Sequence, residues 1–295
     1  MSELMFMNLS VGAIGVRGFT LDDTLELAQK TGFAGIDFDI REVMTLADEE
    51  GLEAVKARFE NRDVLPGQWS LPVAWQDDDR WRKDLAELPR LAALGRELGC
   101  TRTSTWCPPA SDVRSFDENF AWHVARFGPI AEVLAAHDCM LGIEFIGPKT
   151  LRTGKRYPFI HTLEGMMRLA DAIGTGNVGL LLDAWHLYTS GGSLADLDAI
   201  TADDVVNVHV NDAPQGVALE DQVDNVRRLP METGVIDLPG FIRKLDEMGY
   251  QGPVTAEPFS ARLNDIAAKS PERAAGLVKS RMDELWQAAG LSTTS

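Results

Sequence analysis

Four polar residues that can bind a metal ion each stand at the end of an apolar, strand-like run of the sequence. They are Glu144 in LGIEFIGP, Asp183 in LLLDAWH, His209 in VVNVHVND and Glu257 in PVTAEPF. Three carboxylates and an imidazole at buried strand ends carry charge that is costly unless something compensates it. A divalent cation compensates it, and an oxygen-rich donor set with one imidazole favours Mn²⁺ or Mg²⁺, with Co²⁺ or Zn²⁺ as further candidates.

These four residues meet only if the strands that carry them are parallel and end on one side. Eight strand-like runs alternate with helical patterns along the chain, which is typical of an α/β fold of the (β/α)8 TIM-barrel type, about 250 residues long. The runs cover residues 5–12, 35–39, 64–71, 100–106, 139–146, 178–184, 205–211 and 253–259. In such a barrel the C-terminal ends of the strands form the active-site face. A doubly wound open sheet has the same alternation and is the structural alternative.

The segments between these runs have helical spacing and end signals. Residues 21–33 place leucines on one face and end near Gly32, and residues 237–250 begin with Asp237 as an N-cap. Residues 80–99 also have helical spacing, but Pro89 is expected to kink or split that helix.

The domain organisation is simple. No linker-like composition divides the chain, so we expect a single catalytic barrel over residues 1–285 and a C-terminal tail over residues 286–295.

Composition favours a small-molecule partner. The net charge of −17 repels nucleic acid and anionic membranes at long range, and no apolar run reaches the roughly 18 residues of a membrane span. The N-terminal segment carries Glu3 and no basic region, so it does not resemble a signal peptide. Cys100, Cys107 and Cys139 are unevenly spaced, which favours free thiols in a reducing cytoplasm. We expect a cytoplasmic protein that binds neither nucleic acid nor membrane, and the sequence leaves a homo-oligomer open.

A glycine-rich segment after the first strand imitates a dinucleotide-binding loop. Gly12, Gly15 and Gly18 have the spacing GxxGxxG, whereas the dinucleotide fingerprint is GxGxxG. The second glycine is therefore misplaced for a pyrophosphate, and we interpret the segment as a βα loop at the barrel mouth.

A basic cluster follows Glu144 in a very acidic chain. Lys149, Arg152, Lys155 and Arg156 lie on the expected catalytic face, where they would clamp a phosphate, a carboxylate or a hydroxyl-rich substrate. The alternative is a solvated loop whose cations pair with local acids.

Tryptophans follow the third and fourth strand-like runs. Trp69, Trp75 and Trp106 are candidates to stack on a sugar face, with Trp106 taken as the substrate contact, and packing at the barrel mouth is the alternative for each of them.

Four segments resemble the xylose-isomerase-like TIM barrels, a family of sugar and sugar phosphate isomerases and epimerases. The segments are LLLDAWHLYTSGG, VHVNDAP, RRLPMETGVIDLPGF and GYQGPVTAEPF, and the resemblance covers about residues 5–285. It implies a metal held by Glu144, Asp183, His209 and Glu257. It also implies that His186 binds a substrate oxygen and that Arg227 contacts the substrate beyond the metal.

The chain departs from the family pattern at two places. The family has PGEG after the arginine and this chain has PMETG from Pro230, so the local turn is expected to differ. Ketohexose 3-epimerases carry a glutamate six residues after the first ligand, where this chain has Thr150. This second departure argues against a ketohexose 3-epimerase activity.

The site implied by the resemblance suits proton transfer next to a carbonyl. A divalent metal would polarise the carbonyl and stabilise the enediolate, while Glu144 and Glu257 remove and return a proton from opposite faces. We therefore predict a metal-dependent isomerase or epimerase acting on a keto-sugar, a sugar phosphate or a related polyol. A dehydratase or lyase on a keto-sugar or keto-inositol is the alternative, because the same intermediate can expel a β-hydroxyl.

Two further functions, less closely related to sugar isomerisation, are also compatible with a barrel fold. An endonuclease IV-like DNA-repair enzyme would need several zinc ions and many histidines, whereas this chain has five histidines and a net charge of −17. A non-catalytic binding barrel would not need the complete ligand set.

Overall fold

Eight parallel strands close into a barrel in the computed structural model, which describes residues 5–292. Every neighbouring pair of strands in the barrel is parallel, and β1 pairs with the last strand as well as with the second. The strands are β1 (Phe6–Leu9), β2 (Gly35–Phe38), β3 (Leu65–Ser70), β4 (Arg102–Cys107), β6 (Met140–Phe145), β8 (Val178–Asp183), β9 (Val205–Val210) and β10 (Pro253–Ala256). The closed ring confirms the predicted (β/α)8 barrel and excludes the open sheet.

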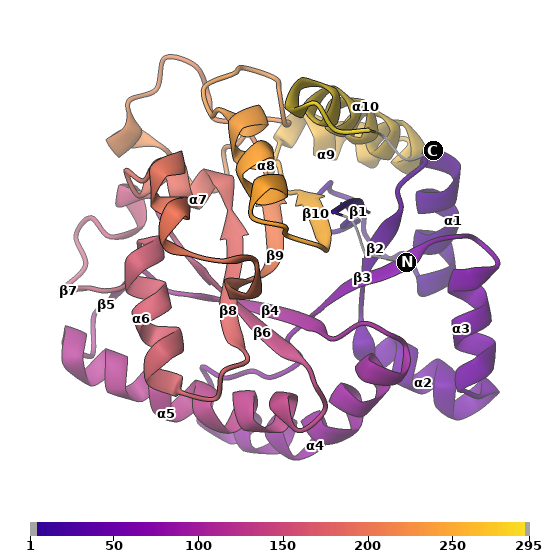
Figure 1. The fold of residues 1–295 in the computed structure, drawn as a ribbon, viewed down its shortest axis with the longest axis horizontal. Helices are drawn as coiled ribbons and strands as arrows, with labels where there is room; N and C mark the ends of the chain where they lie inside the picture. The colour runs from indigo at the N-terminus through magenta and orange to yellow at the C-terminus, as the bar shows by residue number, and fades with distance from the viewer. Residues whose placement is uncertain (1–4, 293–295) are drawn as a thin grey trace.

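Helices surround the barrel on its outside (Figure 1). They are α1 (Leu21–Thr31), α2 (Ile40–Glu50), α3 (Leu52–Glu60), α4 (Asp78–Glu97), α5 (Phe116–Ala135), α6 (Leu163–Ile173), α7 (Ala184–Thr189), α8 (Leu238–Glu247), α9 (Ala261–Ala267) and α10 (Pro271–Ala289). A two-stranded antiparallel sheet of β5 (Ala110–Ser111) and β7 (Tyr157–Pro158) joins two of the loops on the catalytic face. The 3-10 turns are η1 (Lys149–Leu151), η2 (Leu194–Ala199), η3 (Ala202–Asp204) and η4 (Leu219–Asp221).

The helix ends follow the predicted signals, with one exception. Helix α1 ends at Gly32 in the left-handed conformation, and the Asp237 side chain accepts a hydrogen bond at the start of α8. Helix α4, in contrast, runs through Pro89 without interruption, so the split expected there is absent. Leu88 and Leu91 are buried on either side of the proline, and this packing holds the helix together across the missing backbone hydrogen bond.

The C-terminal helix continues past residue 285. Helix α10 extends to Ala289 and buries Trp286, so helical packing includes the beginning of the segment expected as a tail. Residues 1–4 and 293–295, which contain Glu3 and the end of that segment, lie outside the described residues. Within residues 5–292, no helix is both long enough and apolar enough to cross a bilayer.

The glycine-rich loop after β1 has a packing explanation. Gly15 has a positive φ of 85°, and a Cβ at this position would lie 2.9 Å from the Cα of Asn264 in α9. Glycine therefore allows the loop to approach α9 closely. The three predicted free cysteines are buried and unpaired in the described part of the chain.

Candidate metal centre

The four predicted ligands meet at the C-terminal end of the barrel. Glu144, Asp183, His209 and Glu257 each offer a donor atom, and these atoms all lie within 4.8 Å of one another. His209 Nδ1 is 3.7 Å from Glu144 Oε1 and 3.5 Å from Glu257 Oε2. The donors therefore surround a single point, as a mononuclear site requires.

Strand register explains how the side chains converge. Asp183 on β8 is paired with His209 on β9, so both side chains leave the sheet at the same level. A register shift between Leu180 and Leu181 precedes this pair, and bulges of this kind re-aim side chains at barrel rims. Glu144 is the fifth residue of β6, and Glu257 directly follows β10. Each ligand thus stands where an apolar strand reaches the mouth.

The electrostatics of the cluster depend on burial and on mutual charge. Burial and the charges of Glu257 and Asp183 raise the pKa of Glu144. Burial alone would raise the pKa of Glu257, but His209 and Arg227 hold it below its usual value. Burial would lower the pKa of His209, but the neighbouring carboxylates raise it to about 10. The two glutamates are therefore pushed toward opposite protonation states.

The donor set fits a divalent cation. Glu144 Oε1 and both ring nitrogens of His209 are buried and have no hydrogen-bond partner among the described residues. Buried polar atoms are nearly always satisfied, so such atoms in one cluster are expected to have a ligand. Three carboxylates and an imidazole suit Mn²⁺ or Mg²⁺, and Co²⁺ or Zn²⁺ would also bind.

Arg227, which the family resemblance implies as a substrate contact, lies directly beside the cluster. Its Nη1 donates to Asp183 Oδ2 at 2.8 Å and to Glu257 Oε2 at 2.9 Å. Its Nη2 donates to Asp224 Oδ1 at 2.8 Å, and its guanidinium lies over the ring of Phe259. The side chain is almost completely buried. Arg227 therefore supplies positive charge to two of the candidate ligands.

His186 is neutral and lies beside the cluster. Burial lowers its pKa to about 3, and the Gly147 amide donates to Nδ1 at 3.1 Å. Its Nε2 lies 3.1 Å from Arg227 Nη2 and 3.8 Å from Glu144 Oε1. The ring therefore borders the space beside the candidate ligands, where the family resemblance implies a contact with a substrate oxygen.

The loop that carries Arg227 is anchored by Asp212. This buried carboxylate accepts backbone hydrogen bonds from four residues, including Thr233 and Gly234, and its backbone pairs with that of Arg228. Met231 has a positive φ of 62°, a conformation that costs a non-glycine residue about 1–2 kcal/mol. The sequence PMETG therefore places methionine in a left-handed turn at the position where the family pattern has glycine.

Sequence reasoning missed two polar residues that orient this site. Asp224 accepts from both Nε and Nη2 of Arg227, through its backbone and its side chain, and Asn211 donates to Asp183 Oδ1 at 3.2 Å. Asn211 directly follows β9, which is a signal that sequence could have supplied. Asp224 lies in an irregular loop, and only its spacing of three residues from Arg227 hints at the contact.

The basic cluster lies on the rim and is largely paired. Lys149 Nζ is 3.2 Å from Glu220 Oε2, Lys155 Nζ is 2.7 Å from Asp112 Oδ2, and Arg152 donates to the Gly147 carbonyl. Lys149 and Lys155 thus have the local acidic partners that the alternative interpretation expected. A substrate contact from Lys149 stays a prediction, and the residue would have to exchange partners to make it.

The tryptophans divide between packing and exposure. Trp69 and Trp75 are buried, and their indole nitrogens donate to Cys100 O and Thr105 Oγ1. Trp106 pairs in register with Glu144 and is 47% exposed, so it is available for a ring to stack on it.

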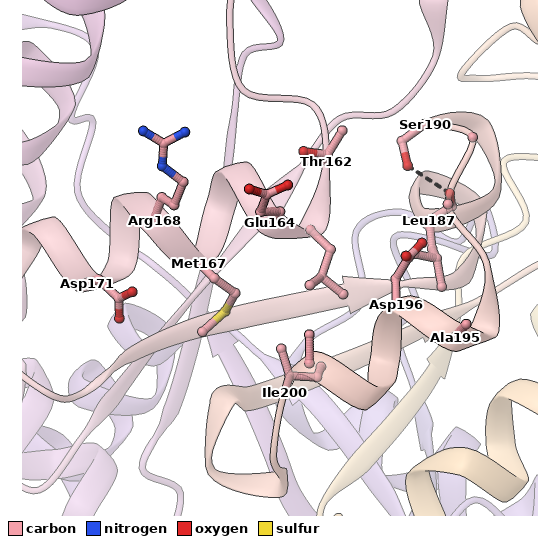
Figure 2. A pocket seen from close by; sticks show the side chains of 14 residues that line it. Thr162, Glu164, Met167, Arg168, Asp171, Leu187, Ser190, Ala195, Asp196 and Ile200 are labelled. Atoms are coloured by element: carbon pink, nitrogen blue, oxygen red, sulfur yellow. Dashed lines mark hydrogen bonds between the residues drawn. The ribbon is translucent and has the colours of Figure 1, made fainter.

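A groove on the protein surface lies away from the candidate metal ligands. It has a volume of about 650 Å³ and lies between α6 and the segment from α7 to η2 (Figure 2). Its wall is formed partly by Met167, Leu187 and Ile200, and none of the four candidate metal ligands lines it. The groove therefore belongs to the outer surface of the barrel.

Variants of Asp183 and His186 are expected to separate metal binding by Asp183 from substrate binding by His186. Asp183→Asn removes a charged donor and should lower metal affinity strongly, while His186→Ala should keep the metal and raise KM or lower kcat. Metal content after dialysis, followed by steady-state kinetics, measures both effects. Full metal and full activity in both variants would contradict the assignment of this segment to the site.

The chain belongs to the xylose isomerase-like TIM barrel family, whose profile matches residues 25–281. A xylose isomerase domain protein from Alicyclobacillus acidocaldarius is 31% identical with a TM-score of 0.84, covering 97% of this chain and 99% of that chain. The structure of the IOLI protein with a bound zinc atom is 18% identical with a TM-score of 0.77, covering 99% of this chain and all of that chain.

Curated relatives include enzymes of two reaction types. An inosose isomerase from Bacillus velezensis is 21% identical over 255 residues, which is 84% of this chain and 87% of the relative. Other matches span about half of the relative or less. They cover 46% of an inosose isomerase from Halalkalibacterium halodurans (24% identical, 48% of this chain) and 40% of a 3-dehydroshikimate dehydratase from Pseudomonas aeruginosa (24% identical, 91% of this chain).

Proposed function

We propose that the protein is a divalent-metal-dependent isomerase or epimerase of a cyclic keto-polyol of the inosose class. The observation that carries the proposal is the cluster of Glu144, Asp183, His209 and Glu257 at the barrel mouth, with unpartnered donor atoms. The inosose isomerases among the relatives support the substrate class. The paired cations on the rim support an uncharged substrate over a sugar phosphate.

The residues of the chain divide the proton transfer among themselves. Glu257 accepts the carbon-bound proton next to the ketone, and its carboxylate is held in place by Arg227 Nη1 at 2.9 Å. Glu144 returns a proton from the opposite face. Return to the same carbon from the other face gives epimerisation, and return to the neighbouring carbon gives isomerisation.

Other residues bind and orient the substrate. His186 binds an oxygen of the substrate, Arg227 contacts the substrate beyond the metal, and Trp106 offers an exposed ring face. The carboxylates and imidazole of the cluster would hold the cation, which supplies Lewis-acid polarisation of the carbonyl when it is bound.

Metal analysis and deuterium incorporation test the proposal. Purified protein should contain a divalent metal or regain one on titration, and metal-loaded protein incubated with a panel of inososes and keto-sugars in D₂O should place deuterium next to the ketone. Protein that binds no divalent metal, or that exchanges no proton in any member of the panel, would contradict the proposal.

A dehydratase acting on a cyclic keto acid or keto-inositol is the second candidate, because the match to the 3-dehydroshikimate dehydratase covers 91% of this chain. The same panel distinguishes the two, since a dehydratase releases water and forms a conjugated product that absorbs ultraviolet light.

The paired rim cations lead to a specific prediction. The double variant Arg152→Gln/Arg156→Gln is expected to change kcat/KM for a neutral inosose and for its phosphorylated analogue by similar factors, because Arg152 donates to the Gly147 carbonyl and the Arg156 guanidinium lies over the ring of Tyr157. Steady-state kinetics with both compounds measures this. A loss confined to the phosphorylated compound would show that the loop clamps an anion.

A further inference from the structure

A second cavity opens on the catalytic face, beside the candidate metal centre. It has a volume of about 410 Å³ and is enclosed by the loops that follow β1, β2 and β3. These loops leave the C-terminal ends of the strands, which is the side of the barrel where the metal ligands lie. The cavity combines the hydroxyls of Ser10 and Ser70 with the apolar surfaces of Phe19, Leu71 and Pro72.

Three of the four charged residues that line this cavity have structural partners. Arg41 donates two hydrogen bonds to Glu87, and Glu42 accepts from the first backbone amide of α1. Asp39 caps α2 by accepting from a backbone amide of its first turn. The remaining charged group is Asp37, which caps no helix and forms no ion pair within residues 5–292; its hydrogen-bond partners are Asn8, Ser10 and Gln68.

Asp37 is held in place by a polar bridge inside the barrel. Asn8 Nδ2 donates to Asp37 Oδ1 at 2.6 Å and to Thr255 Oγ1 at 3.0 Å. Gly67 makes room for this amide, because a Cβ there would lie 2.8 Å from Asn8 Cγ. A register shift of β3 against β2, between Ile36 and Asp37, re-aims the carboxylate at the rim. The arrangement repeats the bulge that precedes Asp183 and His209.

The bridge connects the cavity to the metal side of the barrel. Asn8 is in register with Thr255, and Thr255 is in register with His209, so the three lie at one level. Burial raises the pKa of Asp37, while the charge of His209 lowers it. Asp37 and the candidate metal ligands therefore line the same polar interior of the barrel, although they come from different strands.

We propose that Asp37, together with Ser10 and Ser70, forms a hydroxyl-binding subsite for the part of the substrate that points away from the metal ligands. A carboxylate accepts hydrogen bonds from hydroxyls and repels phosphate or carboxylate, so the subsite selects an uncharged polyhydroxylated ring. The apolar wall lies against the carbon face of that ring. This inference rests on the proposed function for the reaction, but ligand binding tests it independently.

Calorimetric titration with myo-inositol, which has no carbonyl to react, measures the subsite on metal-loaded protein. Wild type should bind it at millimolar concentrations, and Asp37→Asn should weaken binding by about tenfold to a hundredfold, the effect of losing charged hydrogen bonds. Asp39→Asn is the matched control, because it makes the same change in the same cavity and asparagine still caps a helix. Its affinity should stay within about threefold of wild type.

A second variant and a second readout keep the test decisive. Ser70→Val removes a hydroxyl of the proposed subsite, leaves Asp37 in place and should also weaken binding, and metal content and Tm show whether each variant is folded. Equal binding by wild type and Asp37→Asn overturns the subsite, as does a failure of wild type to bind myo-inositol. Asp37-dependent binding without turnover of any ketone would support the subsite and contradict the proposed reaction. If the enzyme turns over a ketone and Asp37→Asn leaves kcat/KM unchanged, the result would support the proposed reaction and contradict the subsite.

Discussion

Glu257→Gln, saturated with metal, is expected to turn over its substrate about 100-fold or more slowly than wild type, the usual contribution of a general acid–base group. Glutamine keeps the shape and one oxygen donor, so part of the metal affinity should remain. It lacks the basic carboxylate that accepts the carbon-bound proton. The rate at saturating metal and the rate of deuterium uptake in D₂O should fall together.

The comparison of Glu257→Gln with wild type needs a control in which the same chemical change is made elsewhere near the barrel mouth. Glu220→Gln replaces an exposed carboxylate that pairs with Lys149 on the rim, and it should alter the rate by less than about threefold, because exposed ion pairs contribute little. Metal occupancy must be measured in each sample, since lost metal would imitate lost chemistry. A fully loaded Glu257→Gln enzyme with the wild-type rate would exclude Glu257 as the base.

The convergence of the four candidate ligands was predictable because strand ends carry their own signal. An apolar run that stops at a carboxylate or an imidazole fixes where the side chain must be, and parallel closure then brings Glu144, Asp183, His209 and Glu257 together. Sequence does not reveal the register shift before Asp183, yet the alternation of the strand survives it. The local sequence pattern was therefore sufficient to predict where the donor side chains lie.

Loop residues were less predictable, because their contacts depend on the path of irregular backbone. The hydrogen bonds of Asp224 to Arg227 and the role of Asp37 arise from loops and bulges that no periodicity encodes. Pro89 is a different case, since a local rule predicted a break and tertiary packing overrode it. The paired rim shows why a cluster of basic residues in sequence does not by itself identify an anion site.

Arg227→Met is expected to make the stability of the protein depend strongly on metal. Arg227 Nη1 bridges Asp183 and Glu257, and removing one partner of a buried ion pair costs about 3–5 kcal/mol. A methionine keeps contact with Phe259 but leaves the carboxylates to repel one another. The Tm in chelator should therefore fall by roughly 10 °C.

Added metal should reverse most of that loss, because a cation bound by the same carboxylates replaces the missing charge and binding to the folded state stabilises it. Thermal unfolding of wild type and variant, in chelator and in saturating Mn²⁺, measures the coupling. Arg228→Met is the matched control, since this neighbouring arginine makes no contact with the ligands and donates to the Arg227 carbonyl. An Arg227→Met protein destabilised equally with and without metal would mean that Arg227 acts through packing on Trp185 and Phe259, and that its charge is not coupled to the metal centre.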